Sequence, residues 1–417
     1  MKRKLLRQIL NEWRTNIWLA VELLLVSGVM WWLTDTLWVK HATFHEPLGY
    51  DISHVYRLNI ATLNEKSPDF KPYPDDDASI ADYQTLVSRL EARPEIETVC
   101  SSVNSYFYNP NNSYTSMYLD SIGGNYLRRW VTPGFFRIFR IHGVNGETPE
   151  EMDKELEKSP WNWFMASDNL FRYNKPQSIE SMAKLTGTKF HQIDSTEYTL
   201  AKVFTPLRYS DYQSAYWNPS LLMPLKQDQL KYFNETLLRV KDNMDKDFVE
   251  NLMKASLNEL RVGNWYIASA TSFEDIRDKY NLNDTQTTLS TVIWSLFLLI
   301  NIFLGVLGTF WFRTSQRTPE IALRMANGAS HSDIFRRVIT EGEIILVAIT
   351  PIAMFICFLL THYELNAFYM GHYFTPARFF GCSIITFLLI SLMILVGSWL
   401  PALKATHISP ALALKTE

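Results

Sequence analysis

Two histidines and a glutamate after the first apolar stretch are the residues best placed to bind a metal ion. His41 and His45 lie four positions apart, so on a helix their imidazoles would share one face, and Glu46 follows directly. Such a group is more often a solvated cluster beside a membrane, and the sequence contains no second cluster that would complete a ligand set. We therefore expect no metal site.

The sequence gives no sign of nucleotide chemistry or nucleophilic catalysis. No glycine-rich loop ends in Gly-Lys-Ser or Gly-Lys-Thr, so a phosphate-binding loop is missing. No spacing of serine, cysteine, histidine and aspartate predicts a nucleophile with its base. The net charge of −3, without a basic patch laced with aromatic residues, argues against nucleic acid. We expect no catalytic residue, no cofactor bound by this chain and no enzyme activity in it.

The polar segment 317–337 carries the clearest local signals. Thr318 is a favoured N-cap, Pro319 suits the first helical position, and Glu320 places negative charge at the positive end of the helix dipole. A short helix is therefore expected to begin here and to continue to Ala326.

The same segment contains a stop signal and a second start signal. Asn327 and Gly328 tolerate the left-handed conformation that ends a helix. Ser330, with Asp333 three positions later, predicts a capping box that starts the next helix. Two interpretations stay open: a simple hairpin that reverses the chain, or a stiff helix presented to a partner. A reversal needs only a few residues, which favours the partner.

Four apolar stretches must position this segment. A helix of about 20 apolar residues crosses a bilayer, and residues 17–39, 285–312, 338–361 and 379–403 all qualify. The segments expected on one side are 1–16, 313–337 and 404–417, and those expected on the other side are 40–284 and 362–378. Basic residues gather in the first three segments, so these should be cytoplasmic.

Glu22 lies inside the first span, where an ionised carboxylate is costly unless it is paired. It could mark the face that packs on a partner helix or on a second protomer, or it could extend to the inner headgroups. Glu341 and Glu343 lie nearer the cytoplasmic interface, where anchoring close to a partner is the simplest role.

The large extracytoplasmic region is predicted to have an α+β fold. An α/β subdomain attached to the first two spans is predicted from a helix at 81–90, a strand entering at 94–99, a strand at 237–240, a helix at 246–260 and a strand at 265–270. Residues 108–225 would form an inserted β-rich subdomain. Its many tyrosine, tryptophan and phenylalanine residues would either fill a β core or form a recognition surface.

Three motifs resemble those of the MacB/FtsX/LolC family of ABC-transporter permeases. Residues 313–330, "RTSQRTPEIALRMANGAS", are similar to the family's cytoplasmic signature, and residues 401–415, "PALKATHISPALALK", to its closing motif. Residues 131–141, "VTPGFFRIFRI", are similar to a motif of its periplasmic domain, although Arg140 stands where glycine is usual. The four-span order is also the family plan.

The resemblance implies a four-helix membrane protein with a MacB-like periplasmic core domain at 40–284 and an FtsX-like permease domain at 285–415. The implied location is the bacterial inner membrane, with the large domain in the periplasm. The implied partners are two copies of a cytoplasmic ABC ATPase that binds ATP and Mg, a second permease protomer of the same or a related chain, membrane lipid, and a further periplasmic or outer-membrane protein.

Within this scheme the short helix is the coupling helix, which docks on the ATPase. The implied function is mechanotransmission for export or extraction of a substrate. The alternative is a regulatory permease that switches an extracytoplasmic partner, such as a cell-wall hydrolase, without transport. The expected ATPase-coupling residues are Pro319, Glu320, Ile321, Ala322, Leu323, Arg324, Met325, Asn327, Gly328, Ala329 and Ser330.

Overall fold

The computed structural model describes residues 13–171, 181–225, 235–256, 259–363, 365 and 375–406. The described residues form two compact units, which are treated separately below. The sheet unit comprises residues 43–285, and the helical unit comprises the residues before 43 and after 285. The basic residues at positions 2–7 and most of the closing motif lie outside the described residues.

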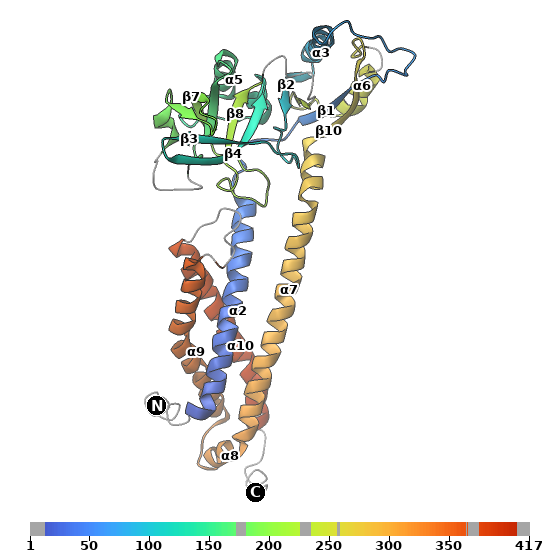
Figure 1. Cartoon of the computed structure of the whole chain (residues 1–417). Helices are drawn as coiled ribbons and strands as arrows, with labels where there is room; N and C mark the ends of the chain where they lie inside the picture. Colours follow the sequence, from blue (N-terminus) through green and yellow to red (C-terminus); the bar gives the residue numbers. More distant parts are fainter. Residues whose placement is uncertain are drawn as a thin grey trace. The chain divides into compact units, whose positions relative to one another are not determined.

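Among the described residues, four helices are long and apolar enough to cross a membrane. They are α2 (Trp13–His45), α7 (Phe273–Gln316), α9 (His331–His362) and α10 (Pro376–Thr406). The expected spans all lie within these longer helices, because helix formation continues past the apolar residues at both ends. A short helix, α8 (Thr318–Ala326), lies at the end of the bundle where α7 finishes and α9 begins (Figure 1).

One half of the sheet unit is an open antiparallel sheet with the strand order β10-β1-β9-β2. Its strands are β1 (Val55–Thr62), β2 (Ile96–Val103), β9 (Glu235–Val240) and β10 (Trp265–Ser272). Two helices, α3 (Asp76–Glu91) and α6 (Phe248–Ser256), share a buried apolar core with these strands. Both helices and the strands β2, β9 and β10 agree with the elements expected on either side of the insert, whereas β1 was not expected from the sequence.

The other half is a closed ring of strands in the order β4-β3-β6-β7-β5-β8, in which β8 pairs back with β4. Its strands are β3 (Tyr114–Leu119), β4 (Ile122–Val131), β5 (Trp163–Ser167), β6 (Lys189–His191), β7 (Glu197–Phe204) and β8 (Ser220–Pro224). The two halves are one continuous sheet, because β2 pairs with β4 through Ser102–Val131 and Val103–Trp130. Closure removes exposed strand edges from the ring.

Most of the aromatic residues of the insert fill these cores. Phe164, Phe190 and Tyr126 are buried in the cluster of the ring, and Phe107 and Tyr108 are buried between the ring, the open sheet and the helices α4 (Phe135–Phe139) and α5 (Pro149–Lys158). The structure therefore favours the β-core interpretation for these side chains.

The 131–141 motif forms a turn and the one-turn helix α4. Gly134, at φ +105°, cannot be replaced by a residue with a side chain without strain, because a Cβ there would lie 2.7 Å from the carbonyl oxygen of Val99. Arg140 ends the helix in the left-handed region, at φ 51° and ψ 39°, a conformation in which glycine carries no penalty. The local backbone thus explains why glycine is usual at this position in the family that the motif resembles.

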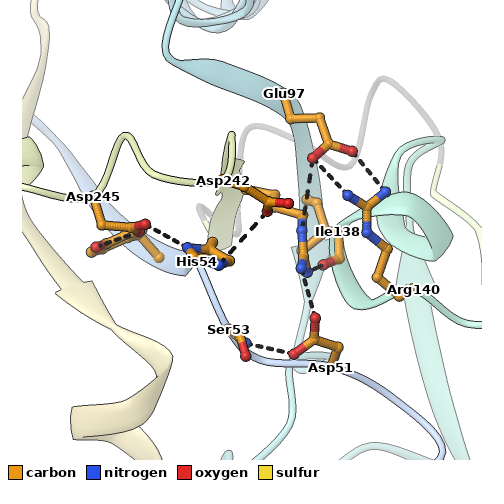
Figure 2. Close-up of polar contacts among 10 residues, drawn as sticks. Asp51, Ser53, His54, Glu97, Ile138, Arg140, Asp242 and Asp245 are labelled. Atoms are coloured by element: carbon orange, nitrogen blue, oxygen red, sulfur yellow. Dashed lines mark hydrogen bonds and ion pairs between the residues drawn. The ribbon is translucent and has the colours of Figure 1, made fainter.

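Arg140 also makes an ion pair that glycine could not make. Both terminal guanidinium nitrogens lie 2.8 Å from the carboxylate oxygens of Glu97 (Figure 2). The same carboxylate is 3.8 Å from the buried Arg239, which donates to the Ile138 carbonyl and to Asp51, both at 2.7 Å. The pair therefore belongs to a network that joins α4 to β2 and β9.

Comparing two replacements of Arg140 isolates the free-energy cost of its left-handed backbone from the stabilisation by its ion pair. Arg140→Ala and Arg140→Gly both remove the pair, but only the alanine variant keeps a Cβ in the left-handed conformation. We expect the glycine variant to be more stable than the alanine variant by about 1 kcal/mol. Thermal unfolding of the purified full chain in detergent measures this difference. Equal midpoints for the two variants would show that the position carries no strain.

Candidate functional site

The start of α8 differs from the sequence expectation at one residue. Thr318 is the first helical residue and not the N-cap, and the N-cap position is Arg317. The prediction for Thr318 is wrong because α7 extends to Gln316, so a single residue separates the two helices and has no room for the extended backbone of a capping residue. Thr318 Oγ1 donates instead to the Ser315 carbonyl at 2.8 Å.

The end of α8 depends on Gly328. Gly328 has φ +91°, whereas Asn327 has φ −87° and is not left-handed, so that part of the expectation is wrong. The Ala329 amide bonds to the Arg324 carbonyl at 3.0 Å and the Gly328 amide to Met325 at 2.9 Å, the two bonds of a Schellman motif. Only the glycine needs the left-handed conformation in this motif. The predicted capping box of Ser330 and Asp333 is present and starts α9.

The two sides of α8 have different surroundings. Ile321 and Ala322 are buried, and Ile321 packs with Ile334 of α9. On the other side Leu323 is 54% exposed, and Pro319 and Ala326, at helical spacing from it, are exposed as well. We call Pro319, Leu323 and Ala326 the free face of α8. Of the expected coupling residues, Pro319 and Leu323 are exposed on this face, whereas Ile321 and Ala322 are buried.

Two carboxylates attach α8 to its neighbours. Glu341 of α9 lies 3.1 Å from Arg313 and 2.8 Å from Arg317, which bracket the end of α7. Glu320 lies 2.7 Å from Arg324 on its own helix and 3.8 Å from Arg337 of α9. Burial alone would raise the pKa of Glu320, but the hydrogen bond from Arg324 and the neighbouring positive charges lower it overall. Both carboxylates therefore hold the turn between α7 and α9 in one arrangement.

Glu22 lies against another helix of the same chain. The hydroxyl of Thr309 on α7 donates to its carboxylate at 2.8 Å, and Glu22 is half-buried. This geometry favours the partner-helix explanation over extension to the headgroups. Glu343 has a similar contact, since Ser391 of α10 donates to it at 2.8 Å.

The structure also reveals an ion pair that sequence reasoning missed. Asp35 of α2 is fully buried and accepts two hydrogen bonds of 2.6 Å from the guanidinium of Arg378 at the start of α10. Both residues were visible in the sequence, one inside an apolar stretch and one beside another. No signal in the sequence connected them, because 343 positions separate them.

A second missed site lies in the sheet unit, in the loop between β7 and β8. Its residues 207–217, here called the clamp loop, contact the segments at both ends of the unit. Arg208 donates to the Glu46 carbonyl just after α2, and the ring of Tyr212 packs at a tilt against that of Phe44 of α2, with ring centroids 5.7 Å apart. Glu46, considered above as a metal ligand, thus serves here as a backbone acceptor.

The clamp loop binds the start of α7 through Asp211. Its carboxylate accepts hydrogen bonds of 2.9 and 2.6 Å from Arg277 and a further bond from Asn281. Tyr212 adds a hydroxyl contact of 2.9 Å to Thr285. Burial would raise the pKa of Asp211, but the bonds from Arg277 and Asn281 lower it below its usual value. One loop therefore fastens the end of α2 and the start of α7 to the strand ring.

Comparison with known proteins gives matches in both halves of the chain. Residues 292–410 match the family model described as FtsX-like permease C-terminal. The macrolide export ATP-binding/permease protein MacB of Campylobacter jejuni is 25% identical over 284 residues, which are 67% of this chain and 43% of that protein. The pyoverdine export ATP-binding/permease protein PvdT of Pseudomonas aeruginosa is 30% identical over 140 residues, 32% of this chain and 20% of that protein.

The chain spans less than half the length of these relatives. Among solved structures, the extracellular domain of the ABC-type transporter YknZ from Gram-positive bacteria aligns with 51% of this chain and all of that domain, at 8% identity and a TM-score of 0.31. The family model and the MacB relatives confirm the resemblance found in the sequence motifs.

Proposed function

We propose that this chain, an ABC-transporter permease of the MacB/FtsX type, couples ATP hydrolysis by a separate cytoplasmic ATPase to movement of its extracytoplasmic domain, for export or extraction of a substrate. The observation that carries the proposal is the free face of α8. This apolar face is exposed, whereas the opposite side of the helix packs on α9 through Ile321 and is joined to it by the ion pair of Glu320 with Arg337. Such a face suits a docking partner that pushes on it.

The path of the push is proposed from helix continuity. Ile321 packs on α9, and Glu341 joins α9 to the end of α7, so a force on α8 reaches both helices. Helix α7 continues without interruption from Gln316 to Phe273, and its first turns are bound by the clamp loop. The clamp loop lies in the connection from β7 to β8 of the ring. Movement of α7 or α2 would therefore act on the ring.

The ATPase and the other partners complete the proposal. This sequence contains no phosphate-binding loop, whereas the relatives are named ATP-binding/permease proteins. We infer that ATP and Mg bind to two ATPase copies, that two permease protomers assemble, and that the protein resides in the bacterial inner membrane with residues 40–284 in the periplasm. A periplasmic or outer-membrane partner would receive or deliver the substrate.

Leu323→Asp tests the docking face. A buried leucine contributes about 1.5–3 kcal/mol, so the substitution should weaken ATPase co-purification from native membranes by on the order of 10–100-fold. Gln316→Asp is the matched control, because it adds the same charge at an exposed position outside the free face. Unchanged co-purification with Leu323→Asp would reject the free face as the docking site. Absence of any ATPase with the unmodified protein would reject the proposed function.

A further inference from the structure

An open groove lies beside α3 in the sheet unit. Its cavity volume is about 540 Å³. Residues of α3 and β2 line it, together with residues that directly follow β4 and β8. Small-molecule sites in proteins have volumes of roughly 300–1,000 Å³, so the groove has the size of a ligand site. We call it the α3 groove.

The α3 groove lies where the open sheet and the strand ring separate. β2 pairs with β4 through its last two residues, Ser102 and Val103, and the chain then leaves β4 through Thr132 and Pro133. The two sides are joined there, because the Thr132 amide donates to the Ser101 carbonyl and the Ser101 amide donates to Thr132 Oγ1, both at 2.9 Å. The walls are therefore fixed before any ligand binds, which lowers the free-energy cost of binding.

The lining of the α3 groove combines an apolar surface with a single charge. Val87 of α3, Val99 of β2, Pro133 and Leu225 provide the apolar surface. Among the described residues of the lining, Glu91 alone has a charged side chain, and it is exposed. The groove is thus suited to a ligand that carries one positive charge on an apolar body.

Glu91 lacks an internal partner in the described part of the chain. It is the last residue of α3, where the negative end of the helix dipole disfavours a carboxylate. The two nearest arginines are engaged elsewhere, since Arg89 donates to the Glu259 carbonyl and Arg137 to the Asp153 carboxylate, both at 3.0 Å. Partial burial raises the pKa of Glu91, and the charge of Arg137 opposes this rise only in part. A bound cation would compensate the carboxylate.

A polypeptide segment fits the α3 groove less well than a small molecule. A peptide that adds to a sheet needs free backbone groups at a strand edge. On this side of β2 the amide and carbonyl of Ser101 are already bonded to Thr132, and Gly134 packs so closely that its Cβ would lie 2.7 Å from the Val99 carbonyl oxygen. The groove therefore offers side chains and not backbone groups.

We propose that the α3 groove binds an amphipathic organic cation. Its ammonium or guanidinium group would pair with Glu91, and its apolar body would lie against Val87, Val99 and Leu225. This inference concerns the sheet unit alone. It does not depend on the proposed function, because neither α8 nor an ATPase takes part.

The test titrates the purified full chain, in mild detergent and without ATPase, with the cationic dye rhodamine 6G and follows fluorescence anisotropy. We expect Glu91→Gln to weaken binding by about fivefold, because the partner of the dye's charge is lost. Glu157→Gln is the matched control, since Glu157 is an exposed carboxylate in the last turn of α5 and does not line the groove. Dye that enters the micelles contributes equally to all variants.

A second variant supplies the cation from the chain itself. Ser88 lines the groove one helical turn before Glu91, so Ser88→Lys should pair with the carboxylate and weaken binding of the dye at least as much as Glu91→Gln. Neither variant should lower the thermal unfolding midpoint, because Glu91 has no internal partner to lose. A lower midpoint for Glu91→Gln would assign the carboxylate to the fold and overturn the proposal.

Three further results would contradict the proposal. Unchanged binding with Glu91→Gln, or an equal loss with Glu157→Gln, would show that the carboxylate does not bind the cation. Equal affinity for the anionic dye sulforhodamine B, which has the same ring system, would show that charge plays no part. Displacement of rhodamine 6G by an oligolysine peptide at equal concentration would assign the groove to a basic protein partner, because oligolysine has the charge without the apolar body.

Discussion

Arg378→Met is expected to destabilise the helical unit by about 3–5 kcal/mol. The substitution would leave the fully buried carboxylate of Asp35 without the guanidinium that donates its two 2.6 Å hydrogen bonds. Inside a membrane no water can replace these two bonds, so the buried carboxylate would lose the positive charge that compensates it. A large fall in the thermal unfolding midpoint in detergent should report the loss.

A second substitution distinguishes lost attraction from an uncompensated charge. Asp35→Asn combined with Arg378→Met removes both charges and should recover most of the lost stability. Lys254→Met provides the comparison with an exposed pair, since Lys254 and Glu250 are both more than 60% exposed and their loss should leave the unfolding midpoint nearly unchanged. If the double variant is as unstable as Arg378→Met, the uncompensated-charge explanation is wrong.

Arg277→Met is expected to release the clamp loop. The Asp211 side chain is only 3% exposed and would lose both bonds from the guanidinium, at a cost of about 3 kcal/mol. Hydrogen exchange of the amides in residues 207–217 should then become faster by on the order of 100-fold. If the proposed function holds, ATPase docking should survive, because α8 is untouched, while ATP-driven change in the strand ring should be lost.

Two controls make the clamp-loop result specific. Arg261→Met removes a more exposed pair with Asp69 in the same unit and should leave exchange of the clamp loop unchanged. Acid should imitate Arg277→Met, because the pKa of Asp211 is lowered in the folded protein. The stabilisation is then fully present above the ordinary value of 3.8 and is lost as the pH falls through the folded pKa. Unchanged exchange in Arg277→Met would reject the clamp loop as the attachment of α7.

Much of the helical unit could be predicted from the sequence, because its signals are local. Long uncharged stretches specify helices in a membrane whatever their neighbours are. The capping box of Ser330 and Asp333 and the left-handed Gly328 also depend only on residues within a few positions. The same holds for the strands and helices that flank the insert, except for β1, which the sequence reading did not predict. The family resemblance rested on such continuous motifs and was confirmed by comparison.

Other features were decided by tertiary structure alone. The sequence marked α8 as one docking segment, but only packing against α9 buried Ile321 and left Leu323 exposed. The Thr318 prediction failed because α7 ran further than its apolar residues indicated. Closure of the strand ring depends on β8 returning to β4, which no local pattern specifies.

The charged contacts show most clearly why these features could not be predicted from the sequence. Asp35 and Arg378 are 343 positions apart, and Asp211 and Arg277 are 66 apart, so no helical or strand period relates them. The sequence by itself determined that these charges would be costly to bury. Which charge would compensate each one depended on the path of the chain, because an ion pair forms only where folding brings two side chains within hydrogen-bonding distance and excludes water around them.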